Sequence, residues 1–232
     1  MNVVLYLTIF LIGMIIGFGI NLGLNEKISK KNTIIYGALT GLLFVIYAFS
    51  IKLNNRTMAS STSWIFALGI IYILTLLTIS IIDGKKREIN KKILLFGFMI
   101  SAIYNLFIYS EEQRAIMYSN LAYLIITCIL LIINTSIEKR KGKPNYTIDI
   151  LILSMYMVTF IWTETYLISV GVALFSIAIY LLINKIKNRD RKHVKINKKI
   201  NMDLPIAFFL GISNIVVVIL LNILGNYLSV IH

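Results

Sequence analysis

Long apolar runs alternate with short polar gaps along the whole chain. Each run is close to the roughly 20 residues that an α-helix needs to cross a bilayer. Eight such runs are predicted, at residues 2–24, 33–51, 62–82, 93–110, 115–135, 148–163, 166–184 and 204–230. The pattern therefore predicts an all-α, polytopic membrane protein with eight transmembrane helices, formed as a single domain over residues 1–232. Only "TET" at 163–165 separates the sixth run from the seventh, which indicates a hairpin with a tight turn.

The positive charges fall almost entirely in alternate gaps. Of the 23 Lys and Arg residues, 20 lie in the first, third, fifth and seventh gaps. The remaining three are Lys52, Arg56 and Arg114. Because cytoplasmic loops of membrane proteins are enriched in Lys and Arg, this distribution predicts that the odd-numbered loops are cytoplasmic. Both termini are then expected outside, an N-out/C-out topology.

Composition supports a membrane class. The chain is 58% hydrophobic and only 14% charged, whereas soluble domains carry about 25% charged residues. The net charge of +13 lies between apolar runs, so we interpret it as a signal of topology and of contact with anionic membrane lipids, with no nucleic-acid partner expected. The single cysteine, Cys128, excludes an internal disulfide, and no metal site or other cofactor is expected. Residues 1–24 lack a basic n-region and a cleavage signal, so we expect a retained helix.

The chain has ten acidic residues, of which Glu111, Glu112 and Glu164 fall in turns expected at the outer face. Glu26, Glu88, Glu138 and Asp190 lie among basic loop residues and are expected to be solvated. Asp203 precedes Leu204-Pro205, where an acidic residue complements a helix N-terminus. Asp149 begins the sixth run and has a similar explanation available. Asp83 ends the third run, at a helix C-terminus, where the helix dipole disfavours an anion.

Ionisable residues at membrane depth are candidates for function. Asp83 and Asp149 would both lie at the cytoplasmic face. Two facing carboxylates can share a proton, so that one activates water while the other polarises a peptide carbonyl. This is the chemistry of an aspartic protease. The 66 residues between the two aspartates do not by themselves establish that they meet.

Several motifs resemble the type IV prepilin peptidases, bacterial membrane aspartic proteases of the GxGD type. Gly13-Met-Ile-Ile-Gly17-Phe-Gly-Ile-Asn21 is similar to the family's G-x-x-x-G-S-F-L-N segment, and "LPIAFFLGIS" near the end is similar to I-P-F-G-P-F-L-A-L-G. Asp83-Gly-Lys-Lys-Arg-Glu-Ile resembles D-x-K-x-x-x-I-P-N, whose Asp is catalytic in the family. The family's second catalytic aspartate, in G-x-G-D-x-K, corresponds to Asp149 in Tyr146-Thr-Ile-Asp149-Ile-Leu. The chain resembles a divergent, short member, because both glycines and the Lys of that motif are absent, as are the C-x-x-C pairs of the first loop.

The resemblance implies a plasma (inner) membrane protein of bacteria that cuts the basic leader from type IV prepilin or pseudopilin substrates at the cytoplasmic face. Asp83 and Asp149 would be catalytic. One alternative is a catalytically degenerate homologue that assists pilin assembly, since Tyr146 and Ile148 stand where the family has glycine. Another is a small transporter that uses the two aspartates as proton or cation sites. Transport sites usually lie near the bilayer midplane, which counts against this alternative.

Overall fold

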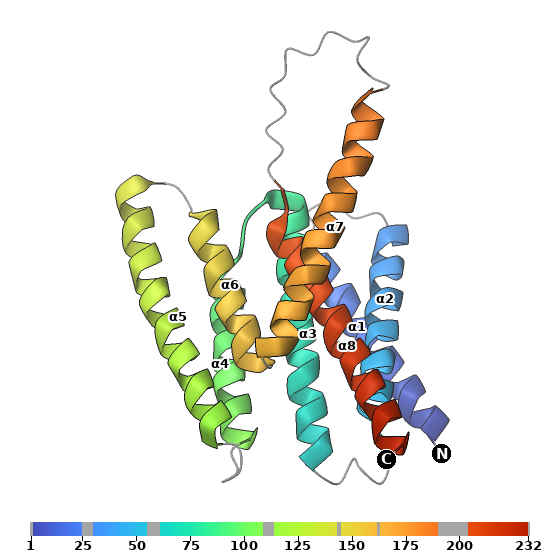
Figure 1. The fold of residues 1–232 in the computed structure, drawn as a ribbon. Coiled ribbons are helices and arrows are strands. Elements are labelled where there is room, and N and C mark those ends of the chain that lie inside the picture. The colour runs from blue at the N-terminus through green and yellow to red at the C-terminus, as the bar shows by residue number, and fades with distance from the viewer. Residues whose placement is uncertain are drawn as a thin grey trace. The chain divides into compact units, whose positions relative to one another are not determined.

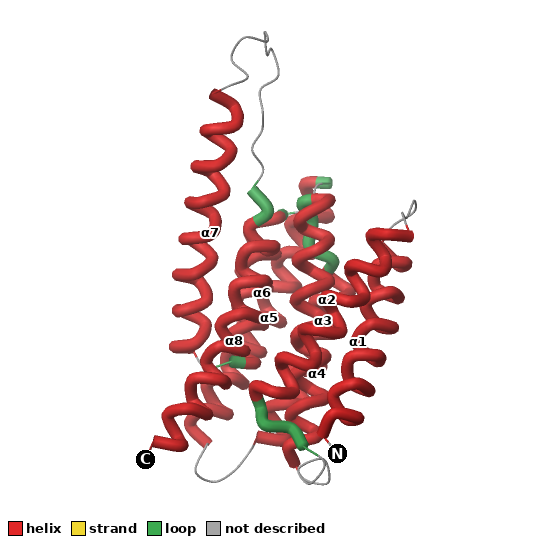
Figure 2. The backbone as a smooth tube through the Cα atoms, turned by 90° about the vertical axis from the view of Figure 1, so that its right-hand side faces the viewer, coloured by secondary structure: helices red, strands yellow, loops and turns green. Residues whose placement is uncertain are grey.

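The structure is a computed structural model that describes residues 2–24, 30–54, 61–108, 114–142, 145–161, 163–189 and 204–231. Within these ranges the chain forms eight helices and no strand (Figures 1 and 2). The helices are α1 (Asn2–Leu24), α2 (Lys30–Ser50), α3 (Ser61–Lys86), α4 (Lys91–Ile108), α5 (Arg114–Lys141), α6 (Tyr146–Phe160), α7 (Thr163–Arg189) and α8 (Ile206–Ile231).

The prediction of an all-α chain is confirmed for the described residues, and each predicted apolar run overlaps one of the eight described helices. Among the described residues, six helices are long and apolar enough to cross a membrane, namely α1, α2, α3, α5, α7 and α8. Helix α6 has only 15 residues. At about 1.5 Å per residue it is about 22 Å long, less than the roughly 30 Å of a hydrocarbon core. The described helices thus support a membrane protein, in which α6 is the shortest.

Large apolar side chains cover much of the surface of these helices. Leu174 and Phe175 on α7 are 62% and 68% exposed, and Ile132 on α5 is 67% exposed. Soluble proteins rarely expose wide contiguous apolar surfaces. Lipid contact gives these side chains a favourable environment, and the apolar exterior agrees with the hydropathy of the sequence.

The first of two compact units contains Met1–Leu74 and Val218–His232. In it α1 and α2 pack closely, because glycines of the two helices face one another. A Cβ added to Gly13 would lie 2.9 Å from the Cα of Gly41, and one added to Gly17 would lie 3.0 Å from the Cα of Gly37. Small residues at this spacing allow helix backbones to approach in a membrane.

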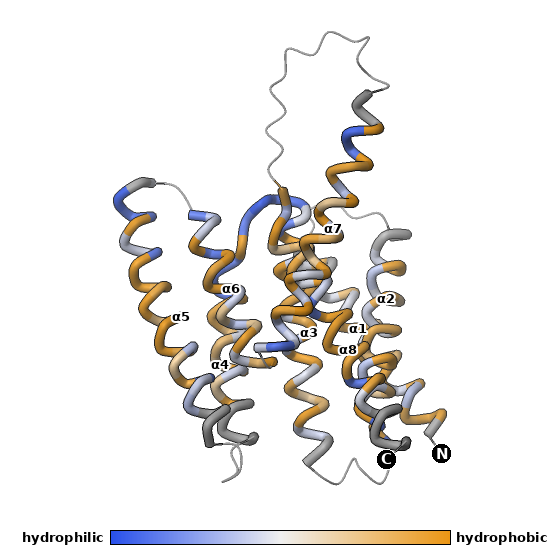
Figure 3. Tube along the Cα trace, viewed as in Figure 1, coloured by the Kyte–Doolittle hydropathy of each residue, from blue (hydrophilic) through white to orange (hydrophobic). Residues whose placement is uncertain are grey.

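The second unit contains Thr75–Val217, and therefore the end of α3, helices α4 to α7 and the start of α8. Helix α6 contacts α4, α5 and α7. The end of α3, the start of α4, the end of α5 and the start of α6 gather at one end of this unit (Figure 1). Figure 3 shows hydrophilic residues at these helix ends and mostly hydrophobic residues along the helices between them. This polar end of the second unit carries the candidate site.

Buried polar side chains pair inside the second unit. The hydroxyls of Ser101 on α4 and Thr159 on α6 lie 2.7 Å apart. The side-chain amide of Asn214 on α8 donates a hydrogen bond of 3.2 Å to the hydroxyl of Ser169 on α7. All four side chains are at most 1% exposed. Hydrogen bonds of this kind join helices where no water is present to satisfy polar groups.

Candidate functional site

Asp83 lies in the last turn of α3 and is fully buried, with 0% exposure. Both of its carboxylate oxygens accept hydrogen bonds. The hydroxyl of Tyr146 donates to Oδ1 at 2.7 Å, and the backbone N–H of Phe208 donates to Oδ2 at 2.9 Å. Asp83 therefore connects three helices, because Tyr146 begins α6 and Phe208 lies in the first turn of α8.

Tyr146 also contacts the start of α8. Its hydroxyl oxygen accepts hydrogen bonds from the backbone N–H groups of Ile206, at 3.1 Å, and Ala207, at 3.4 Å. The first N–H groups of a helix have no partner within the helix and need one elsewhere. In α8 the N–H groups of Ile206, Ala207 and Phe208 all find that partner in the side chains of Tyr146 and Asp83.

This arrangement explains why a carboxylate can end α3. The C-terminal dipole of its own helix disfavours Asp83, but the N-terminus of α8 presents the opposite end of a helix dipole to it. A residue that precedes α8 was expected to complement this N-terminus. That residue, Asp203, lies outside the described residues, and Asp83 provides a carboxylate there from α3.

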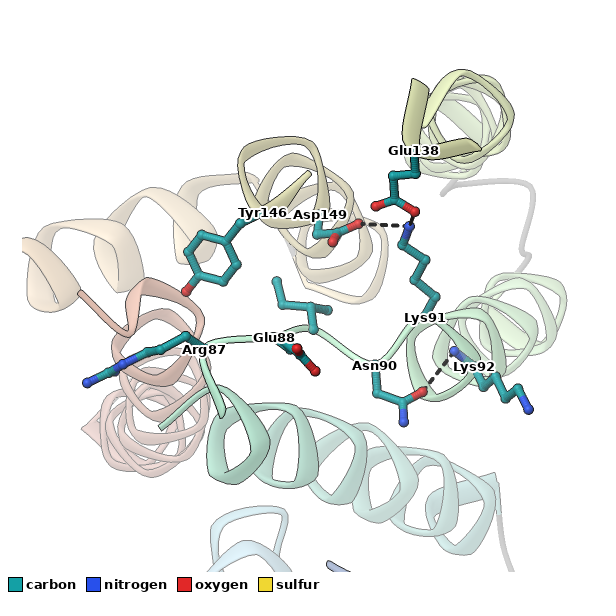
Figure 4. Close-up of a pocket in the computed structure, with 9 residues that line it drawn as sticks. Arg87, Glu88, Asn90, Lys91, Lys92, Glu138, Tyr146 and Asp149 are labelled. Carbon is teal, nitrogen blue, oxygen red and sulfur yellow. Dashed lines mark hydrogen bonds and ion pairs between the residues drawn. The ribbon is translucent and has the colours of Figure 1, made fainter. Parts of the chain in front are cut away.

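Asp149 lies in the first turn of α6 and is 2% exposed. The side-chain amide of Asn134 on α5 donates to its Oδ1 at 2.6 Å. The ammonium of Lys91, at the start of α4, lies 3.8 Å from the same oxygen and forms an ion pair with Glu138 of α5 (Figure 4). The charges of Lys91, Glu138 and Asp149 thus join the ends of α4, α5 and α6.

Glu138 is less solvated than the sequence predicts. Its side chain is 19% exposed, and besides the ion pair with Lys91 it accepts a hydrogen bond of 2.9 Å from the backbone N–H of Asn145. Asn145 is the residue before α6, so Glu138 fixes the start of the helix that carries Asp149. Glu88 is exposed, as expected, whereas Glu26 and Asp190 lie outside the described residues.

A pocket of about 500 Å³ opens beside Asp149. Its lining comes from the link between α3 and α4 and from the facing ends of α5 and α6: Arg87, Glu88, Ile89, Asn90, Lys91, Lys92, Glu138, Tyr146 and Asp149 (Figure 4). Basic and acidic side chains occur in equal number around it, and Asp83 is not among the lining residues. Among the described residues, no group of three or more His, Cys, Asp or Glu side chains could hold a metal ion.

The structure brings Asp83 and Asp149 to the same end of the second unit but gives each its own partners. Tyr146 and Asp149 lie one turn apart on α6, and Figure 4 shows the tyrosine hydroxyl and the carboxylate pointing in opposite directions. No hydrogen bond or ion pair joins the two described carboxylates. Asp83 accepts at both oxygens, whereas Asp149 accepts only at Oδ1 among the described residues. Oδ2 of Asp149 is therefore the carboxylate oxygen still available to a water or a substrate group.

Sequence reasoning missed four residues of this site: Tyr146, Asn134, Lys91 and Glu138. One signal was present for Asn134, a carboxamide near the end of a predicted transmembrane run. A polar residue there and Asp149, at the start of the next run, must lie at similar depth on neighbouring helices, which favours contact between them. No comparable signal identified Tyr146 as the partner of Asp83.

Comparison with known proteins found no relative of this chain. No protein-family model matches the chain, and no curated protein and no solved structure matches it either. The site is therefore interpreted from its own residues.

Proposed function

We propose that the chain is a membrane aspartic endopeptidase of the bacterial plasma membrane, which cuts the basic leader from type IV prepilin-like or pseudopilin-like substrates. The observation that carries this proposal is the burial of two carboxylates, Asp83 and Asp149, at one end of a single helical unit, where Asp149 lines a pocket. Charged groups buried in a membrane protein are costly and mark functional sites. The resemblance of the sequences around both aspartates to the prepilin peptidases supplies the reaction.

The proposal includes an orientation. Lys85 and Lys86 at the end of α3, and Lys139 and Arg140 near the end of α5, are exposed at the same end of the second unit as the two aspartates. The enrichment of basic residues in cytoplasmic loops favours the cytoplasm for this end. Eight crossings would then leave both termini outside, with α6 and α7 forming the short hairpin predicted from the sequence.

In the proposed reaction Asp149 takes a proton from a water molecule, whose oxygen attacks the scissile carbonyl carbon. Asp83 starts the cycle protonated and gives its proton to the carbonyl oxygen, which forms a tetrahedral gem-diol. On collapse Asp83 takes a proton back from one hydroxyl of the gem-diol, and Asp149 passes the proton that it took from water to the leaving amine. Asp149 is assigned to the water because its Oδ2 has no hydrogen-bond partner among the described residues and because it lines the pocket. The substrate's apolar helix would lie among the spans and present its leader junction to this pocket.

One observation favours a second function, a non-catalytic partner of pilin-like proteins. Both oxygens of Asp83 are occupied by Tyr146 and by the start of α8, which is a structural task that a carboxylate can perform without catalysis. Such a protein would bind a prepilin-like helix and leave its leader uncut.

Cleavage in cells separates the two functions. The chain would be co-expressed with a prepilin-like protein, and loss of the leader followed as a gel shift beside Asp83→Ala and Asp149→Ala variants. The endopeptidase predicts cleavage by the natural chain and none by either variant. Intact substrate that co-purifies with a well-expressed chain would instead support the non-catalytic partner.

A further inference from the structure

Tyr146 links the surroundings of Asp83 to those of Asp149 in the candidate site. It occupies α6 one turn before Asp149, and its hydroxyl donates to Asp83 of α3. Its side chain also lines the pocket beside Asp149. Of the residues that line this pocket, Tyr146 is the one whose side chain donates a hydrogen bond to Asp83 in the described structure. Any movement of the first turn of α6 relative to α3 must stretch or break this 2.7 Å hydrogen bond.

We propose that Tyr146 is a positioning residue, which orients the Asp83 carboxylate and fixes it relative to the helix turn that carries Asp149. This inference rests on the proposed endopeptidase function. A carboxylate can rotate about its own side-chain bonds, and two donors on different oxygens remove that freedom. Tyr146 holds Oδ1 while the N–H of Phe208 holds Oδ2.

The contacts of Tyr146 with α8 make the orientation rigid. Because the hydroxyl oxygen accepts from Ile206 and Ala207 while its proton goes to Asp83, its position is fixed by two helices besides its own. A phenylalanine at position 146 would keep the ring but lose all three contacts. The N–H of Ile206 would keep the carbonyl of Leu204 as its acceptor, whereas that of Ala207 would lose the tyrosine oxygen.

The test compares Tyr146→Phe with Tyr156→Phe in purified protein that cuts a prepilin-like substrate. Tyr156 lies on the same helix and is fully buried, but it packs against Phe98 and not against Asp83, so it controls for the loss of a buried tyrosine hydroxyl from α6. We expect Tyr146→Phe to lower kcat about 10- to 100-fold, which corresponds to about 1.4 to 2.7 kcal/mol. Its KM should stay within about twofold, because a positioning residue acts on the reacting group rather than on substrate binding. The Tyr156→Phe control should not show this separation of kcat from KM.

A second measurement does not need activity. The chain has four aspartates, so selective ¹³C labelling of aspartate side chains gives few carboxyl resonances in a solid-state NMR spectrum. The Asp83 signal is the one that Asp83→Asn removes. We expect this signal to move in Tyr146→Phe and to stay in place in Tyr156→Phe.

The outcomes distinguish the two hypotheses. If the natural chain cuts no substrate, the endopeptidase fails, and the Asp83 resonance alone decides whether Tyr146 orients the carboxylate. An unchanged Asp83 resonance in Tyr146→Phe would overturn the inference. An unchanged kcat in Tyr146→Phe would also overturn the inference. A Tyr146→Gly variant that cuts faster than the natural chain would overturn it too, because Tyr146 would then obstruct Asp83.

Discussion

Lys91 is predicted to stabilise the buried start of α6 as the cation that pairs there with carboxylates of the described residues. Its ammonium pairs with Glu138 and lies 3.8 Å from Oδ1 of Asp149, whose side chain is 3% exposed. The variant Lys91→Met keeps most of the side-chain volume and removes the charge. Two carboxylates would then remain at the polar end of the second unit, near one another and without their cation.

The magnitude follows from these distances. At an effective dielectric constant of about 20, unit charges about 4 Å apart attract by about 4 kcal/mol before desolvation is subtracted. Removal of one partner from a buried ion pair typically costs about 3 to 5 kcal/mol. Because the Lys91 side chain is 28% exposed, some solvent remains available to the carboxylates. We therefore expect Lys91→Met to lower the free energy of unfolding by about 2 to 4 kcal/mol.

Equilibrium unfolding in mixed detergent micelles, followed by intrinsic fluorescence, measures this change. Lys92→Met is the matched control, since Lys92 is the exposed neighbour on the same turn and Figure 4 shows its side chain directed away from the ion pairs. It should change the free energy of unfolding by less than about 0.5 kcal/mol. The triple variant Lys91→Met, Glu138→Gln, Asp149→Asn should be more stable than Lys91→Met alone, because it leaves no unpaired charge. Equal stability of Lys91→Met and Lys92→Met would refute the reasoning.

Two further predictions concern packing inside the second unit. Gly211→Ala should destabilise the protein by about 1 to 3 kcal/mol, because the added Cβ would lie 2.1 Å from the hydroxyl oxygen of Ser80. The double variant with Ser80→Ala should recover most of that loss in the same unfolding assay, and a double variant as unstable as Gly211→Ala would contradict the close contact of α3 with α8. Ser101→Ala should cost about 1 kcal/mol by removing the hydrogen bond between the Ser101 and Thr159 hydroxyls, while Thr159 keeps its bond to the carbonyl of Tyr156. The pair Ser101→Ala, Thr159→Val should cost less than the sum of the single changes, and strict additivity would show that the two hydroxyls do not interact.

The positions of the helices could be predicted from the sequence. Apolar runs near the length of a membrane span, interrupted by basic gaps, are a strong signal, and they located all eight described helices to within a few residues. The short sixth run corresponds to the 15 residues of α6. Close packing of α1 on another helix could also be predicted, because Gly13 and Gly17 have the spacing of small residues that pack helices together, but the partner helix α2 is known only from the structure.

The partners of the two aspartates could not be predicted. Helices that are apolar on nearly every side do not reveal which side faces the interior, so the rotation of α3, α6 and α8 about their axes was undetermined. The contact between Asp83 and Phe208 joins residues 125 positions apart. Tyr146 was interpreted only as the loss of a glycine, although its hydroxyl is what completes the cap of α8.

The chemistry around Lys91 was missed for a related reason. In a gap rich in Lys and Arg, each basic residue is interpreted as a signal of membrane topology. A lysine that forms an ion pair with a partly buried carboxylate is then overlooked. Lys91 and Lys92 are adjacent in the sequence, yet Lys91 pairs with Glu138 while Lys92 is exposed. Which of the two neighbouring lysines faces α5 and α6 depends on the orientation of α4 about its axis. The sequence alone does not determine that orientation.

Cleavage by purified protein is the most direct test of the proposed endopeptidase. The chain, reconstituted in liposomes of anionic lipid, would be mixed with a prepilin-like substrate and the product identified by mass spectrometry. Asp83→Asn and Asp149→Asn would be measured beside it, with Lys139→Met as the control, because Lys139 is exposed and does not line the pocket. The proposal predicts a single cut at the end of the basic leader by the natural chain and by Lys139→Met, and no cut by either aspartate variant. Substrate that is bound but never cut, or cleavage that survives in Asp83→Asn and Asp149→Asn, would contradict it.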